Sequence, residues 1–245
     1  MKIVLKVSAL SICLVLMTHC TVQASGVSPN NVFYVCALGG VGLGSFKREV
    51  DELGHFWTAQ TTTPTYGTGM FSFGHRWQRP SKAPPSSGRQ VVFHGIDFSL
   101  GLSALKDTVY DDTPGVSYPA SSTLRHPIAL ALAYIGGISY QTWSFYGKAG
   151  LSVGLFQHKT DFSSPEGAHN GYEASHTINT WKLGPTLSVG ASYALSKAWR
   201  LTIQQTSTFY QGIETSYSPA TNSDFRQNTG PLYVGQLMLG ITYLF

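Results

Sequence analysis

Residues 181–195 of this 245-residue chain read Trp-Lys-Leu-Gly-Pro-Thr-Leu-Ser-Val-Gly-Ala-Ser-Tyr-Ala-Leu. Apolar side chains, most of them large, occupy every odd position from Trp181 to Leu195, whereas Lys182 and small or hydroxyl residues occupy the even positions. Successive side chains of a β-strand point to opposite faces. The alternation therefore predicts a long strand with one apolar face and one small, polar face.

Seven further segments repeat this alternation with varying regularity. They cover residues 32–44, 66–77, 92–104, 128–140, 143–156, 199–210 and 232–245. The connectors at 45–65, 105–127, 157–177 and 211–231 are long and polar, whereas those at 141–142 and 194–198 are short. The Pro/Ser-rich connector 78–90 is long although strand parity places it on the side of the short turns. We predict eight antiparallel strands in one domain.

The apolar faces of these strands are predicted to meet lipid. Only 11% of the residues are charged, about half of the quarter that is usual in soluble proteins. Aromatic residues gather at strand ends, as in the girdles of membrane barrels. A membrane-spanning sheet has to close because lipid offers no partner to an open edge. The predicted fold class is all-β, an eight-stranded antiparallel up-and-down transmembrane β-barrel.

The N-terminus has the pattern of a cleaved secretory signal peptide. Lys2 and Lys6 precede an apolar run at 7–17 and small residues around Ala24. We expect a signal peptide at 1–24 and the barrel at 25–245. Loss of the two lysines lowers the net charge from +4 to about +2, which is too small and scattered to indicate nucleic acid as a partner. No mature window approaches the roughly 18 to 20 apolar residues of a membrane-spanning helix.

Cys36 is the single cysteine expected in the mature chain, because Cys13 and Cys20 lie within the predicted signal peptide. An intramolecular disulfide is therefore not expected.

The last six residues, Gly240-Ile241-Thr242-Tyr243-Leu244-Phe245, are the most specific element of the sequence. They resemble the terminal assembly signal of the small eight-stranded outer-membrane proteins, the group of the OmpA transmembrane domain, OmpX/Ail and the opacity proteins. In that resemblance Gly240, Tyr243 and Phe245 carry the signal. It implies location in the outer membrane of a Gram-negative bacterium, and as partners the assembly machinery, outer-membrane lipid and lipopolysaccharide.

Four charged residues on the predicted inner face form a candidate lumen network: Arg76, Asp97, Lys148 and Lys182. A buried charge must be paired, so we expect Asp97 to lie between Arg76 and Lys148 in a plug. The alternative is a cation-rich passage, as in a small-solute porin or an OmpW-like hydrophobic conduit. Eight strands leave an interior that side chains roughly fill, which favours the plug.

The histidines and one serine of the expected mature chain are candidate reactive or metal-binding groups. His55, His126, His158 and His169 are expected in polar loops without ligand-like spacing. His75 and His94 are expected to lie outward near Trp77, as an interfacial polar belt or, less favoured, a catalytic pair.

Glu173, Ser175 and His176 are the residue types of a lipid hydrolase, but they lie within four residues of one another. A catalytic triad converges from separate elements. We therefore predict no enzymatic activity, no catalytic residue, no metal and no cofactor.

The predicted surface loops interleave Tyr110, Tyr118, Tyr172 and Tyr217 with charged and small polar residues. Such composition suits adaptable protein recognition, and equally an ordinary solvated loop. With the family resemblance, it leads us to expect a structural and surface-interaction role, adhesin- or opacity-like, with host surface molecules as partners of the loops.

Overall fold

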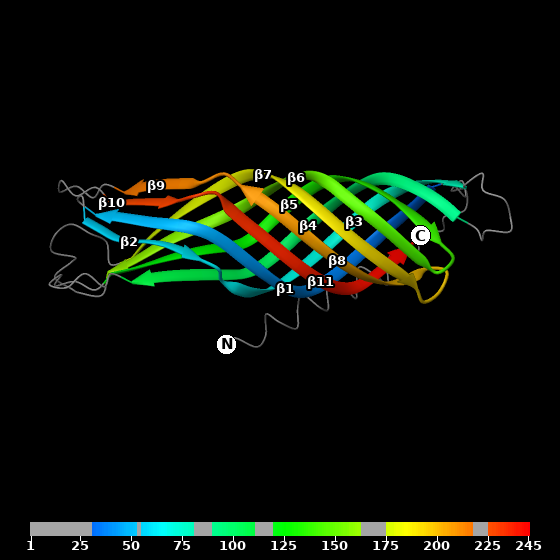
Figure 1. The fold of residues 1–245 in the computed structure, drawn as a ribbon, viewed down its shortest axis with the longest axis horizontal. Helices are drawn as coiled ribbons and strands as arrows, with labels where there is room; N and C mark the ends of the chain where they lie inside the picture. The colour runs from blue at the N-terminus through cyan, green and yellow to red at the C-terminus, as the bar shows by residue number, and fades with distance from the viewer. Residues whose placement is uncertain (1–30, 53–54, 81–89, 111–119, 163–174, 218–224) are drawn as a thin grey trace.

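The computed structural model describes residues 31–245 except 53–54, 81–89, 111–119, 163–174 and 218–224. The described residues form eleven β-strands (Figure 1). They are β1 (Asn31–Glu52), β2 (His55–Thr62), β3 (Thr65–Pro80), β4 (Gln90–Tyr110), β5 (Ala120–Tyr140), β6 (Trp143–Phe162), β7 (Ser175–Ala194), β8 (Trp199–Tyr210), β9 (Ile213–Tyr217), β10 (Phe225–Thr229) and β11 (Leu232–Leu244).

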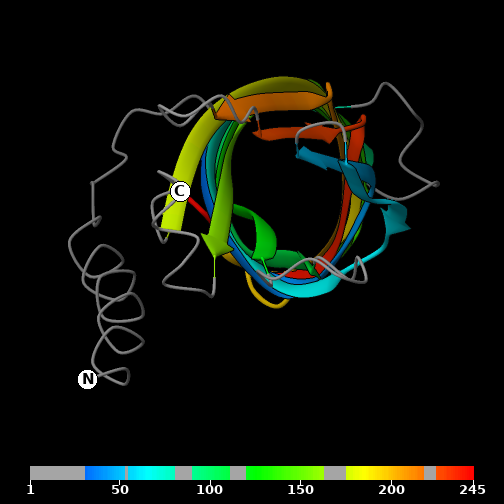
Figure 2. The same ribbon diagram turned by 90° about the vertical axis from the view of Figure 1, so that its left-hand side faces the viewer.

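Eight of these strands close into a ring, as Figure 2 shows from one end. The order around the ring is β1-β3-β4-β5-β6-β7-β8-β11, and β11 pairs back with β1. This closing seam runs antiparallel from Tyr34↔Leu244 to Ser45↔Tyr233. The predicted eight-stranded antiparallel barrel is confirmed.

One end of the ring, here called the turn end, carries short connections and the C-terminus. Gln141 and Thr142 form a two-residue turn between β5 and β6. Residues 195–198 link β7 to β8, and the Ser196 hydroxyl accepts hydrogen bonds from the backbone N–H groups of Ala198 and Trp199.

At the opposite loop end, the strands continue well beyond the predicted boundaries. The expectation of long loops at 45–65, 105–127, 157–177 and 211–231 is wrong for most of the described residues in these segments. There, β2-β1-β10-β9 form one sheet, and the ends of β4, β5, β6 and β7 form another. We call this part the two-sheet extension. It consists of residues 46–52, β2, β9 and β10 on one side and residues 105–110, 120–126, 157–162 and 175–183 on the other.

The extension has two sheets because strand pairing stops at two places. β7 pairs with β8 only from Thr186 toward the turn end, and β4 pairs with β3 only from Ser103 toward the turn end. From these points toward the loop end, backbone pairing no longer closes the ring. Side chains between the two sheets must therefore hold them together.

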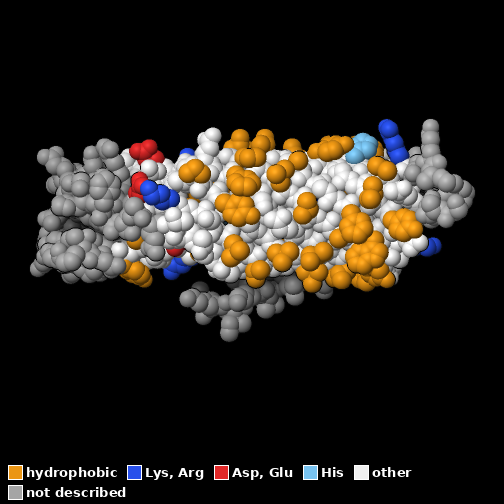
Figure 3. Space-filling view, viewed as in Figure 1, with side chains coloured by type: hydrophobic (Ala, Val, Ile, Leu, Met, Phe, Trp, Pro, Cys, Tyr) orange, Lys and Arg blue, Asp and Glu red, His pale blue; other side chains and the backbone are white. Residues whose placement is uncertain are grey.

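The outer surface of all eight ring strands carries exposed large apolar side chains, such as Phe33, Phe73, Leu132 and Leu239. On the face seen in Figure 3, apolar side chains cover the barrel toward the turn end, acidic groups lie toward the loop end, and basic groups lie at both ends. From Trp143 to Leu155, at about 3.3 Å per residue and a tilt of about 40°, β6 rises roughly 30 Å. That length matches a bilayer core of about 30 Å, so we call this surface the apolar band. None of the described residues forms a helix long and apolar enough to cross a membrane.

Candidate functional site: the lumen and the two-sheet extension

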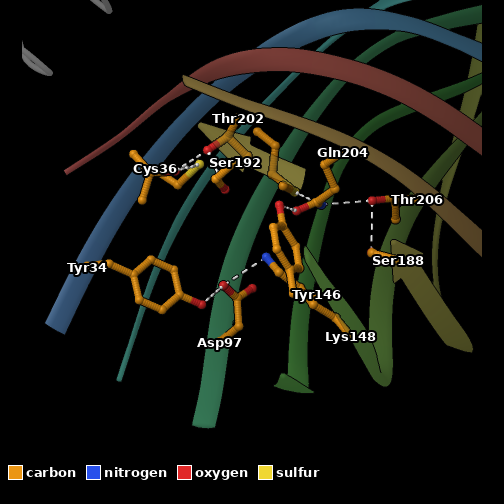
Figure 4. Close-up of polar contacts among 12 residues, drawn as sticks. Tyr34, Cys36, Asp97, Tyr146, Lys148, Ser188, Ser192, Thr202, Gln204 and Thr206 are labelled. Atoms are coloured by element: carbon orange, nitrogen blue, oxygen red, sulfur yellow. Dashed lines mark hydrogen bonds and ion pairs between the residues drawn. The ribbon is translucent and has the colours of Figure 1, made fainter. Parts of the chain in front are cut away.

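A buried polar layer fills the lumen toward the turn end (Figure 4). The Lys148 ammonium on β6 lies 2.9 Å from the Asp97 carboxylate on β4, and both side chains are buried. The Tyr34 hydroxyl on β1 donates a hydrogen bond to the same carboxylate oxygen. Two donors therefore satisfy a carboxylate that is shielded from bulk solvent, as burial of a charge requires.

Gly74 on β3 makes this contact between β1 and β4 possible. It lies between Tyr34 and Asp97 in the strand register. A Cβ atom at Gly74 would lie 2.5 Å from the Tyr34 hydroxyl oxygen. The missing side chain leaves room for the Tyr34 ring to reach across β3.

Arg76 completes the layer through aromatic rings. Its guanidinium carbon lies 4.2 Å from the ring centre of Tyr34, 4.8 Å from that of Phe93 and 5.7 Å from that of Tyr146. Such cation–π contacts are strongest where water is excluded. Arg76 thus lies beside the Asp97–Lys148 pair with its charge directed at rings, an arrangement that the sequence pattern did not indicate.

Lys182, the fourth residue of the predicted network, lies elsewhere. It is half-buried on the inner-face alternation of β7. It is six residues from Ser188, the register partner of Lys148, which at about 3.3 Å per residue corresponds to roughly 20 Å. The structure thus brings together Arg76, Asp97 and Lys148, and leaves Lys182 near the loop end.

Hydroxyl and amide groups line the middle of the lumen. Ser188 bonds Thr206 at 2.9 Å, Thr186 bonds Thr208 at 3.0 Å, and Gln204 donates to Thr206 at 2.9 Å. They border a cavity of about 40 Å³ that extends from Lys148 to His126. This volume is enough for a few water molecules, since one water needs about 10 to 15 Å³ measured in this way.

Cys36 belongs to the same inner wall. It is buried, and its sulfur accepts a hydrogen bond from the Thr242 hydroxyl at 3.1 Å. The thiol therefore lies in the seam between β1 and β11.

An apolar layer closes the lumen toward the loop end. Its core contains Phe46, Tyr66, Leu105, Leu124, Phe156, Tyr210, Ile213, Leu232 and Val234. His126 stacks on Phe156 with 4.5 Å between ring centres and is only 2% exposed. The expectation that His126 lies in a polar loop is wrong.

The sequence pattern missed His126 because the inward-facing side chains of β5 change from even-numbered to odd-numbered positions along the strand. Ala129, Ala131 and Ala133 share one parity, whereas His126 and Leu124 have the other and are buried. The shift coincides with an irregular register around Pro127. Proline is common at such bulges because it lacks the N–H that the ladder needs.

Between the two sheets of the extension lies a set of buried polar contacts that we call the cross-sheet clasp. It consists of Arg48, Asp107, Ser122, His158, Thr160 and Gln227. The Arg48 guanidinium lies 3.4 Å from the Asp107 carboxylate and also donates to the Ser122 hydroxyl. These contacts join β1 to β4 and β5.

The other half of the clasp joins β10 to β6. The Nδ1–H of His158 donates to the Gln227 side-chain oxygen at 2.7 Å, and the Gln227 amide donates to the Thr160 hydroxyl at 2.7 Å. Burial lowers the pKa of His158 to about 4, and the nearby Arg48 charge acts in the same direction. Burial also lowers the pKa of Arg48 to about 10. His158 is therefore neutral and buried at neutral pH, and its expected position in a polar loop is wrong.

The histidines at the turn end flank a tryptophan. His75 and Trp77 on β3 have ring centres 4.7 Å apart, and Trp77 and His94 are 5.3 Å apart. In the register His94 faces Trp77, whereas His75 faces Ile96.

Of the candidate hydrolase residues, Ser175 and His176 do not converge. Ser175 and His176 are neighbours on β7, so their side chains point to opposite faces of the strand. The residues Glu173 and His169, and the side chain of His55, lie outside what the structure describes. Among the described residues, no three His, Cys, Asp or Glu side chains are grouped in a way that could hold a metal ion.

The C-terminal residues lie at the seam of the ring. Gly240 pairs with Leu38 of β1. The Tyr243 ring lies 4.8 Å from the rings of both Trp199 and Phe245, and the Phe245 N–H donates to the Phe33 carbonyl at 2.9 Å.

No protein-family model matches this chain, and no curated protein matches it in sequence. Among solved structures, the chain is similar to the outer membrane protein OprG from Pseudomonas aeruginosa, with 13% identity, 88% of this chain and 96% of that chain covered, and a TM-score of 0.48. For neisserial surface protein A, the identity is 13%, the coverage 86% and 96%, and the TM-score 0.43. For Ail, the attachment invasion locus protein of Yersinia pestis, the identity is 12%, the coverage is 85% of this chain and 99% of that chain, and the TM-score is 0.34. The closed ring of eight antiparallel strands, established by its own strand pairing, gives this chain the fold of the small outer-membrane β-barrel proteins.

Proposed function

We propose that this chain is an outer-membrane barrel that supports membrane integrity and presents a surface-interaction module, without enzymatic activity. The observation that supports this most is the contrast between the two ends. The ring is filled by side chains, whereas the two-sheet extension continues past the apolar band at the loop end. Short turns face the periplasm and longer segments the exterior in barrels of this type, so the extension would face outward.

The content of the lumen favours an anchor over a conduit. The Asp97–Lys148 layer and the apolar layer around Phe156 are both buried, and the cavity between them measures about 40 Å³. A small-solute porin or an OmpW-like hydrophobic conduit would require at least one layer to move aside. Conductance is therefore the property that separates the two functions.

The partners of this proposal follow from its surfaces. The apolar band would contact outer-membrane lipid and lipopolysaccharide, and the C-terminal strand would meet the assembly machinery. The extension, in which β4 ends at the exposed Tyr110, would meet host surface molecules. Tyrosines among polar residues suit adaptable recognition.

The test removes part of the extension and keeps the ring. Tyr210 and Leu232 are register partners, so an Asn-Gly turn in place of residues 211–231 can join β8 directly to β11. Bacteria that make the intact protein should adhere several-fold more to wells coated with fibronectin or laminin than bacteria without it. The variant should lose this adhesion. It should still fold, so the unboiled protein should migrate faster on a denaturing gel than the boiled protein.

Three results would count against the proposal. Stable single-channel conductance of the intact protein in a planar bilayer would support a porin. Equal adhesion by the variant would place the interaction outside the β9–β10 segment, and no adhesion by the intact protein would leave a purely structural role.

A further inference from the structure

We propose that the outer surface of β1, β3 and β4 at the turn end binds the phosphate of a phospholipid headgroup. A surface pocket of about 350 Å³ lies there, lined by Asn31, Trp77, Gln78, Arg79 and His94. The inference rests on the proposed membrane span, because it takes the ligand from the leaflet at the turn end.

The register places the pocket across three neighbouring strands. Asn31 faces Trp77, and Trp77 faces His94, so these three residues form one row. Arg79, paired with Val92, lies two residues further toward the turn end. An arginine thus stands just beyond a row of amide, indole and imidazole groups.

The pocket begins where the apolar band ends. One row closer to the middle of the band lie Phe33, His75 and Ile96, and Phe33 and Ile96 are about half exposed, at 53% and 48%. The ring centres of Phe33 and His75 are 4.5 Å apart. Figure 3 shows a histidine beside a basic side chain at this end of the band. Acyl chains against the apolar row would bring a headgroup to the level of the pocket.

The lining is made of hydrogen-bond donors and contains no carboxylate. The Arg79 guanidinium offers a planar fork that matches phosphate oxygens. The Trp77 indole donates one N–H, the Asn31 amide donates two, and the His94 imidazole offers an N–H. Tryptophan combines an apolar body with a polar edge, which suits the boundary between lipid tails and headgroups.

A lipid explains the site better than free phosphate does. The donors alone would serve either source of phosphate. The exposed Phe33 and Ile96 side chains directly below them would gain from acyl chains, and an inorganic anion would leave them unused. The ligand class is therefore a glycerophospholipid, with an anionic headgroup such as phosphatidylglycerol favoured by Arg79.

The first test compares two arginine variants of the full-length barrel. Arg79→Gln removes the charge from the pocket, and Arg125→Gln removes an equal charge from an exposed position on β5 at the loop end. Native mass spectrometry of the purified protein, titrated with phosphatidylglycerol, measures the bound fraction. Arg79→Gln should weaken binding about tenfold, the effect of one lost charge-assisted contact, and Arg125→Gln should bind as the unaltered protein does.

A second test does not depend on the folding of the Arg79 variant. The indole N–H signal of Trp77, assigned by its loss in Trp77→Phe, should shift in NMR spectra on addition of dihexanoyl phosphatidylglycerol. Inorganic phosphate at the same concentration should leave it unchanged.

Three outcomes would overturn the proposal. They are an unshifted Trp77 signal, an equal response to inorganic phosphate, and equal losses of binding in the two arginine variants. None of these outcomes would alter conductance or adhesion, so failure here is distinguishable from failure of the proposed function.

Discussion

At the scale of single residues, Gln141 holds the β5–β6 turn in a backbone conformation that favours glycine. Its φ is 53°, and among the described residues it is the one non-glycine residue with positive φ. Positive φ at the first but not the second central position of a two-residue hairpin is typical of a type II′ turn, where glycine is preferred at the first position. We expect the free energy of unfolding of the Gln141→Gly variant to exceed that of the Thr142→Gly variant by about 1 kcal/mol, because a side chain in the left-handed region costs about that much. Urea unfolding in lipid vesicles measures the difference, and equal stabilities would contradict the assignment.

The Asp97–Lys148 pair also makes a prediction at this scale. Lys148→Met removes the cation and leaves a buried carboxylate whose one hydrogen-bond donor among the described side chains is the Tyr34 hydroxyl. Loss of one partner of a buried pair costs about 3 kcal/mol or more, whereas replacement of both is often neutral. Asp97→Asn combined with Lys148→Met should therefore regain most of the stability in the same unfolding assay. If the free energy of unfolding of the double variant were as low as that of Lys148→Met, the pair would not act as a unit.

At the scale of strands, the sequence predicted the membrane part well and the extension poorly. Within the apolar band, one face meets lipid and the other meets the lumen, so residues such as Leu187 and Ser188 alternate sharply in hydropathy. In the extension, the outward face meets water, and buried inward residues such as Arg48 and Gln227 are polar too. The alternation that identifies a strand disappears, although the strand continues.

The candidate site divides in the same way. Inner-face alternation placed Asp97 and Lys148 in the lumen, but no sequence signal could place Arg76 between aromatic rings, because Tyr34, Phe93 and Tyr146 come from three different strands. The clasp was missed because its members are far apart in sequence. His158 and Gln227, for example, are separated by 69 positions.

The clasp predicts a pH dependence for the attachment of β10 to β6. His158 has a pKa of about 4 in the fold, against 6.5 for an ordinary histidine. As the pH falls below about 6.5, the unfolded chain takes up a proton that the folded chain refuses. Stability is therefore complete above pH 6.5 and decreases toward pH 4, by up to about 3 kcal/mol.

Urea unfolding in vesicles between pH 7.5 and 4.5 measures this slope. His158→Gln keeps a donor toward Gln227 but does not titrate, so the slope of this variant should be shallower. If both proteins lost stability equally over this range, another group would be responsible.

At the scale of the whole molecule, the barrel depends on the approach of its first and last strands. Gly240 lies in this seam, and a Cβ atom there would lie 1.9 Å from the Ala37 carbonyl oxygen and 2.8 Å from the Leu38 Cα. Both are backbone atoms of β1, so only separation of β1 from β11 could relieve the contact. Gly67 is a matched control, because a Cβ atom on it meets nothing within 4 Å.

Gly240→Ala should therefore fail to close the ring even without cellular factors. We expect a loss of at least about 3 kcal/mol, the upper range for overpacking, and no fast-migrating unboiled form after refolding into detergent micelles. Gly67→Ala should refold normally. Phe245→Ala removes a ring whose one described aromatic contact is Tyr243. This variant should therefore refold in micelles. If Phe245 is part of an assembly signal, the variant should assemble slowly in cells. Refolding of Gly240→Ala to the fast-migrating form would mean that the seam tolerates a side chain there and that Gly240 serves recognition alone.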